Sequence, residues 1–209
     1  MIEWSAIFKI LPIFVLAMIS PGPDFMIVST ISLTRGRADG VKAAAGIATI
    51  ISLYTLVCLT GLSALFGHYL YVTMAIKACG GLYLVYLGYR LWRGSFVKQE
   101  AAEAPVAGSG RRRSAYLAGV VTCLSNPKAV VFFASVFALA LTPDTNLATQ
   151  AALAVGSPSL AFLWFSLVAV GLSRGKVRAR YQRWQKVIDR VTGTLLGFFG
   201  LKLILSAGE

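Results

Sequence analysis

The chain has 209 residues, of which 57% are hydrophobic and 13% are charged, and its mean hydropathy is +0.73. An average soluble domain carries roughly 25% charged residues, so this chain has too few polar side chains to cover a surface that faces water. The composition therefore excludes a soluble globular protein, and the high hydrophobicity excludes intrinsic disorder. We predict one compact membrane domain over residues 1–209.

Six apolar stretches are long enough to cross a hydrocarbon core of ~30 Å as helices, which takes about 20 residues each. They are Ile7–Leu33, Val41–Phe66, Tyr69–Tyr89, Tyr116–Leu141, Leu147–Leu172 and Val187–Leu205. The alternation typical of barrel strands is absent, and a helix satisfies its own backbone polar groups in lipid. We therefore expect an all-α, six-helix polytopic membrane protein. Asp189 is interpreted as a first-turn acid of the last helix, and the basic segment before it as a short interfacial helix.

The net charge of +12 comes from basic residues gathered in alternate connections between these stretches. Sixteen of the 20 lysines and arginines lie in the first, third and fifth connections, between residues 35 and 42, 90 and 113, and 174 and 190. Basic connections face the cytoplasm, which predicts that both termini lie outside. The charge is thus a topology signal that needs no nucleic acid as partner. Binding of membrane lipids or of a partner protein is the alternative interpretation of Arg111–Arg113.

A divergent internal repeat links the two halves of the chain. The segment Gly81–Leu91 aligns with Gly193–Leu203, and two proline-containing interruptions fall at nearly the same offset. Three spans per repeat force the halves into opposite orientations. We predict two inverted three-helix repeats, at about residues 1–95 and 115–209, joined by a cytoplasmic loop at about residues 96–114. The glycines of the last span offer a close-contact face, whose partner is either the other repeat or a second protomer of a homodimer.

The two interruptions lie in the middle of spans one and four. Span one contains Ser20-Pro21-Gly22-Pro23-Asp24, and span four contains Ser125-Asn126-Pro127-Lys128. Proline removes an amide donor and disfavours helix in the residue before it. Each interruption is nine residues, or ~13 Å, from the cytoplasmic face. Broken backbone at that depth is tolerated only where it is buried in protein or lines a cavity, so we predict that the two breaks form a binding site.

The residues at the breaks suit a small zwitterion, although purely structural kinks are the alternative interpretation. Half-helix N-termini after Pro23 and near Asn126 offer free amides to a carboxylate. Asp24 supplies a negative charge for an ammonium group, or a site for a proton. Lys128 would neutralise Asp24 in the empty state and release it when substrate or a proton arrives. The predicted substrate-binding residues are Pro21, Gly22, Pro23, Asp24, Ser125, Asn126, Pro127 and Lys128, with Asp24 also coupling protons; no cofactor or metal site is predicted.

Further motifs follow one another along the chain. They are Pro21-Gly22-Pro23 with Asp24-Phe25, then Gly36, Gly40 and Gly46, then Tyr83-Leu84 and Tyr86-Leu87-Gly88, then Ser125-Asn126-Pro127-Lys128, and last the glycine-rich final span. Together they resemble the LysE/RhtB amino-acid exporters over essentially the whole chain. The resemblance implies a bacterial inner-membrane exporter of an amino acid such as homoserine, threonine, lysine or leucine, driven by the proton gradient. Two departures are Ile50, where relatives have a second glycine, and Pro158, which adds a predicted break in span five.

From these features we expect a secondary transporter that exports a small amino acid or derivative by rocking two inverted halves about a midplane site, and not an enzyme. The alternatives are an exporter of another small solute (a metal cation or a toxic metabolite), a membrane-embedded enzyme, or a non-transporting scaffold. No cluster of intramembrane acids, histidines or paired cysteines supports a metal exporter. An enzyme needs a nucleophile, base or metal site that Asp24 and Lys128 alone do not supply.

Overall fold

The computed structural model describes residues 3–66, 70–96, 114–141, 145–171 and 175–207, and every regular element in these ranges is an α-helix. The helices are α1 (Trp4–Ile19), α2 (Pro23–Arg35), α3 (Arg37–Phe66), α4 (Leu70–Gly94), α5 (Ala115–Leu124), α6 (Pro127–Ala140), α7 (Leu147–Gly171) and α8 (Gly175–Leu205). The all-α prediction is confirmed for these ranges. Residues 97–113 of the predicted cytoplasmic loop, with Arg111–Arg113, lie outside the described residues.

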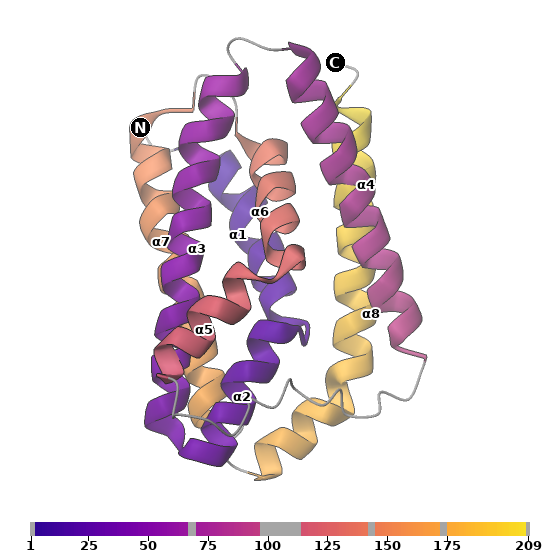
Figure 1. Cartoon of the computed structure of the whole chain (residues 1–209). Helices are drawn as coiled ribbons and strands as arrows, with labels where there is room; N and C mark the ends of the chain where they lie inside the picture. The colour runs from indigo at the N-terminus through magenta and orange to yellow at the C-terminus, as the bar shows by residue number, and fades with distance from the viewer. Residues whose placement is uncertain (1–2, 67–69, 97–113, 142–144, 172–174, 208–209) are drawn as a thin grey trace.

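The helices stand side by side and alternate in direction (Figure 1). In that view α1 and α2 descend, α3 rises and α4 descends, whereas α5 and α6 rise, α7 descends and α8 rises. The start of α1 and the end of α8 lie at the upper end of the molecule. The three predicted basic connections join helices whose ends lie at the lower end, opposite the first and last helical turns.

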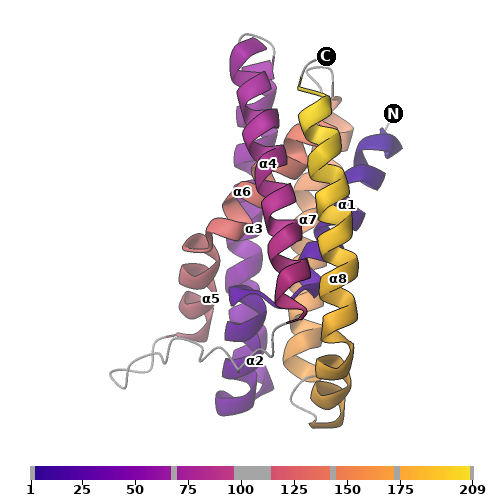
Figure 2. The same ribbon diagram turned by 90° about the vertical axis from the view of Figure 1, so that its right-hand side faces the viewer.

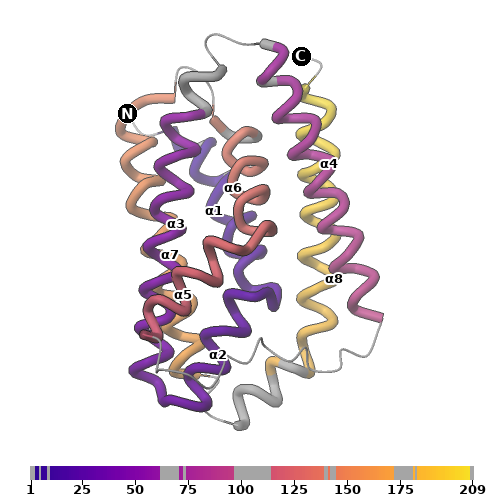
Figure 3. Tube along the Cα trace, viewed as in Figure 1, coloured from indigo at the N-terminus to yellow at the C-terminus, as the bar shows by residue number. Residues whose placement is uncertain are grey.

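Two pairs of consecutive helices, α1 with α2 and α5 with α6, are bent where one helix ends and the next begins. The axes of α1 and α2 differ by 51°, and those of α5 and α6 differ by 61°. Both breaks lie near mid-height of the molecule (Figure 3). They coincide with the two proline-containing interruptions, because proline at the first position of α2 and of α6 starts a new helix after the chain has turned.

Length and hydropathy single out fewer membrane spans than the six expected. Two segments, Arg37–Gly61 in α3 and Leu147–Gly171 in α7, are long and apolar enough by themselves, and the number rises to four if each bent pair is one span. Among the described residues no part of α4 or α8 meets the same criterion. Charged residues within these two helices, such as Lys77 and Asp189, lower their hydropathy. The six-span architecture stays a prediction.

Two local predictions were wrong. Pro158 does not break span five, because α7 runs without interruption from Leu147 to Gly171 with Pro158 inside it. A membrane helix tolerates the single missing amide donor where neighbouring helices pack around it. The basic segment before residue 187 is no separate interfacial helix, because nothing between Gly175 and Leu205 stops helix formation. Asp189 therefore lies in the middle of α8 and not in a first turn.

The glycine-rich face of α8 packs against α4, and the two helices lie antiparallel along each other (Figure 2). A Cβ atom added to Gly81 would lie 2.7 Å from the carbonyl oxygen of Gly200, and one added to Gly193 would lie 2.7 Å from that of Gly88. Backbone therefore touches backbone at two levels of this interface, which we call the glycine seam. The partner of the glycine face is the first half of the same chain, and the homodimer stays a prediction.

Candidate functional site

The first break leaves the N-terminus of α2 open. Gly22 precedes the helix in an extended conformation and has no side chain to cap it, and Pro23 at the first position has no amide hydrogen. The first amide bonded to the preceding chain is that of Met26, which donates to the carbonyl of Gly22 at 2.9 Å. Within the described residues nothing accepts a hydrogen bond from the amides of Asp24 and Phe25. Two donors are thus available at the positive end of a helix dipole.

The second break closes its own helix end. Asn126 is the N-cap of α6, and its side-chain oxygen accepts the amide hydrogen of Lys128 at 3.1 Å. Pro127 occupies the first position of the helix. The amides of Ala129 and Val130 both donate to the carbonyl of Asn126, at 3.0 and 3.3 Å. The amides that were predicted to bind a carboxylate near Asn126 therefore already have hydrogen-bond partners, whereas those at the start of α2 do not.

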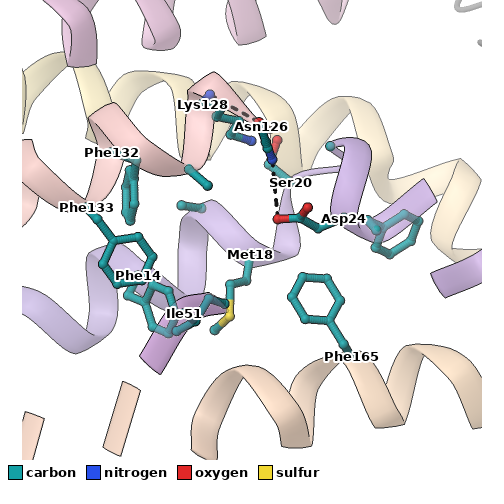
Figure 4. Close-up of a pocket in the computed structure, with 14 residues that line it drawn as sticks. Phe14, Met18, Ser20, Asp24, Ile51, Asn126, Lys128, Phe132, Phe133 and Phe165 are labelled. Atoms are coloured by element: carbon teal, nitrogen blue, oxygen red, sulfur yellow. Dashed lines mark hydrogen bonds between the residues drawn. The ribbon is translucent and has the colours of Figure 1, made fainter. Parts of the chain in front are cut away.

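The two breaks meet through Asp24 and Asn126. The side-chain amide of Asn126 donates to Oδ2 of Asp24 at 3.3 Å, across 102 positions of sequence (Figure 4). The other carboxylate oxygen, Oδ1, is buried and has no hydrogen-bond partner in the part of the chain that the structure describes. The thiol of Cys123, from the end of α5, lies beside the same carboxylate. A buried carboxylate oxygen without a partner is costly unless a proton or a cation joins it.

Lys128 lies close to the first break. Its Nζ atom would be 3.6 Å from a Cβ built on Gly22, so the ammonium group sits against the open end of α2. Asp24 and Asp189 are the negative charges that act on it. Neither carboxylate forms an ion pair with Lys128 within 4.0 Å, as judged over the described residues. The structure thus brings Lys128 and Asp24 to one site but shows no direct contact between them.

A cavity that is partly open to the outside lies between the two breaks. Its polar lining comes from Ser20, Gly22, Asp24, Asn126 and Lys128, and most of the remaining wall is aromatic or aliphatic. Four of the eight predicted binding residues therefore line it. The other four, Pro21, Pro23, Ser125 and Pro127, do not line the cavity and shape the breaks instead.

The sequence analysis missed Asp189 as part of this region. It is 5% exposed on α8, and its Oδ1 accepts a hydrogen bond from the hydroxyl of Ser20 at 3.2 Å. Ser20 itself lines the cavity. An acid within an apolar helix is functional by default, and this signal was available. It was overlooked because Asp189 was assigned to a helix end, where an acid is common.

Side chains that hold the ends of the broken helices were also missed. The carbonyl oxygens in the last turn of α1 accept hydrogen bonds from side chains of α7 and α8: Trp164 to Met18 at 3.1 Å, Tyr181 to Ile19 at 2.9 Å, and Thr192 to Leu16 at 3.5 Å. At the end of α5, Tyr54 of α3 reaches the carbonyls of Cys123 and Leu124 at 3.3 and 3.2 Å. Buried Tyr and Trp normally find such partners, but the sequence does not say which carbonyl is near.

Among the described residues no group of three histidines, cysteines or acids gathers that could hold a metal ion. The charged and polar groups of the cavity instead match an organic zwitterion, with a carboxylate oxygen for a cation and an ammonium group with free amides for an anion.

The chain is similar to known proteins over nearly its whole length. The family model described as LysE type translocator matches residues 15–207. A threonine efflux protein of Salmonella typhi is 34% identical over 203 residues, covering 95% of this chain and 97% of its own. A threonine efflux protein of Escherichia coli (strain K12) is 35% identical over 199 residues, covering 92% and 94%. An uncharacterized membrane protein of the same strain is 29% identical over 200 residues, covering 95% and 89%. No solved structure matches.

Proposed function

Because this chain belongs to the LysE type translocator family, we propose that it exports a small amino acid across the bacterial inner membrane in exchange for protons. Family membership makes it a transporter and sets aside the membrane-enzyme alternative. The threonine efflux proteins among its relatives support amino acids as the substrate class. The observation that carries the proposal is the cavity at which two broken helices bring together Asp24, Asn126 and Lys128.

The two charges of an amino acid have distinct places in this cavity. The α-ammonium group binds Oδ1 of Asp24, which has no hydrogen-bond partner among the described residues. The α-carboxylate binds the ammonium group of Lys128 and the open amides of Asp24 and Phe25. The ammonium group of the substrate thus pairs with the carboxylate oxygen, and its carboxylate group pairs with the lysine and the two amides at the start of α2.

Proton coupling follows from competition for Asp24. A proton on Oδ1 removes the charge that binds the substrate ammonium, so proton and substrate occupy the same carboxylate in turn. Lys128 also has Asp189 and Arg90 in its surroundings, so Asp24 is not the only charged group that acts on it. Exchange of one cation for the other at Asp24 then moves substrate outward and protons inward.

The movement that exposes the cavity to each side is a rocking of the two halves. Their corresponding helices run in opposite directions, and Gly81 and Gly88 meet Gly200 and Gly193 in mirrored order, which supports inverted repeats. The basic residues near the lower helix ends support a cytoplasmic location of that end, with both termini outside.

Transport in inverted membrane vesicles under an imposed pH gradient tests the proposal. We expect gradient-dependent uptake of amino acids by the wild type, and a loss on the order of 100-fold in Asp24→Asn, because removal of a charged partner from a buried site costs about 3 kcal/mol. The matched control is Asp39→Asn, whose carboxylate pairs with Lys42 outside the cavity at 2.9 Å. Unchanged gradient-dependent uptake by Asp24→Asn would exclude Asp24 from the mechanism.

A further inference from the structure

We infer that the amino acid exported by this protein carries an apolar side chain, of the branched aliphatic or thioether kind, and not a hydroxyl group. The inference rests on the proposed function and narrows its substrate class. It comes from the division of the cavity into a small polar end and a larger apolar wall, which Figure 4 shows.

The polar end has just enough groups for the backbone part of an amino acid. Asp24 serves the ammonium, and Lys128 with the open end of α2 serves the carboxylate. Asn126 is engaged twice, by Asp24 and by the amide of Lys128. The hydroxyl of Ser20 is already donated to Asp189 at 3.2 Å. Ser20 and Asn126 are the only uncharged polar side chains among the lining residues that the structure describes, and each already takes part in a hydrogen bond within the protein.

The rest of the wall is apolar and closely packed. Phe14, Met18, Ile51, Phe132, Phe133 and Phe165 line it, from α1, α3, α6 and α7. All six are buried in the surrounding core. The ring of Phe133 contacts those of Phe14 and Phe137, with centroids 5.3 and 5.8 Å apart. These six side chains therefore present no hydrogen-bonding N–H or O–H group to a substrate side chain.

Comparing valine with threonine as substrates tests this inference most directly. The two side chains have nearly the same shape, but threonine has a hydroxyl group where valine has a methyl group. A hydroxyl group pressed against an apolar wall loses its hydrogen bonds to water without replacement. We expect valine to be transported more efficiently than threonine by roughly 10- to 100-fold, the range in which a hydrophobic pocket rejects an added hydroxyl. The names of the relatives predict the opposite order for those proteins.

The experiment measures counterflow of labelled valine and labelled threonine, at equal concentrations, in proteoliposomes that contain the full chain. A valine-to-threonine ratio of rates above about ten supports the inference. Equal rates or faster threonine transport overturn it while leaving amino-acid export in place. Failure to transport valine, leucine and methionine overturns the inference, and failure to transport any amino acid overturns the proposed function as well.

A substitution in the wall tests the cause of the preference. Ile51→Thr places a hydroxyl in the cavity lining and should lower the valine-to-threonine ratio about tenfold. The matched control is Ile50→Thr, since Ile50 is equally buried one position away but does not line the cavity. The ratio within one preparation does not depend on how much protein folds. A ratio that Ile51→Thr leaves unchanged, or that both variants lower equally, would contradict the assigned role of the wall.

Discussion

The two helix breaks use the same proline device but differ in what they leave open. At the second break, the side chain of Asn126 caps α6, and the amides of the first helical turn already donate hydrogen bonds to Asn126. At the first break, Gly22 has no side chain to offer, and no described residue bonds to the amides of Asp24 and Phe25 or to one carboxylate oxygen of Asp24. The first break therefore leaves polar groups without a protein partner in the described residues, whereas the second engages its helix amides internally.

The breaks also differ in how they are held. The carbonyl end of α1 receives side-chain hydrogen bonds from Trp164, Tyr181 and Thr192, all in the second half of the chain. The carbonyl end of α5 is held by Tyr54 alone among the side chains that contact it in the described residues. The first break is thus held by more side-chain hydrogen bonds than the second. Such bonds fix its geometry while the amides at the start of α2 stay available.

Exchanging the acid between the breaks should have the largest effect. The double variant Asp24→Asn with Asn126→Asp keeps the net charge and a good N-cap at position 126, but it moves the carboxylate to the closed helix end. We expect transport to fall 100- to 1,000-fold, corresponding to about 3–4 kcal/mol for a lost charged partner. Uptake by inverted vesicles measures this. Wild-type uptake by the double variant would mean that the two breaks are interchangeable.

Removing the cap of the second break should mainly lower stability. Asn126→Ala loses the N-cap and leaves Oδ2 of Asp24 without its donor, which together cost about 2–4 kcal/mol. Thermal unfolding in detergent, followed by tryptophan fluorescence, should show a clearly lower Tm. Ser125→Ala, at an exposed neighbour, is the control and should change the stability by less than about 0.5 kcal/mol. Equal Tm values for the two variants would argue against a structural role of this cap.

Loosening one support of the first break should have a smaller effect. Tyr181→Phe removes the hydrogen bond to the carbonyl of Ile19 but keeps the ring stacked on Phe25, whose centroid is 4.8 Å away. We expect a loss of about 1 kcal/mol in the free energy of unfolding. The control Tyr86→Phe, on the exposed side of α4, should behave as the wild type. If Tyr181→Phe also behaves as the wild type, this hydrogen bond does not support the break.

Closing the first break should have the smallest effect on stability and still reduce transport. Gly22→Ser gives α2 a side-chain cap, and its Cβ has room, since the nearest atom is Nζ of Lys128 at 3.6 Å. We expect a gain of a few tenths of a kcal/mol, about the usual advantage of serine over glycine at an N-cap. Transport should fall several-fold because the new hydroxyl occupies an amide assigned to the substrate.

Gly156→Ser is the control for this change, since nothing lies within 4 Å of a Cβ at that glycine. Lower stability with unchanged transport in Gly22→Ser would contradict the assignment of the open amides to the substrate.

The sequence predicted the helical fold and the breaks because these depend on local signals. Proline positions, apolar stretches and a buried acid are visible without knowledge of packing. The same local signal misled at Pro158, where neighbouring helices keep α7 intact. The contacts of Ser20 with Asp189 and of Tyr181 with Ile19 span 169 and 162 positions of sequence. Such contacts depend on how the helices pack, so a single sequence could not supply them.

The glycine seam has a consequence for how this protein can move. It joins one helix of each half, and at Gly81 with Gly200 and at Gly193 with Gly88 main chain rests on main chain with no side chain between. Sliding of α4 along α8 would force these atoms to overlap, so the spacing between the two helices is fixed. If the halves tilt against each other, the seam is the pivot, and the largest displacements occur at the helices farthest from it.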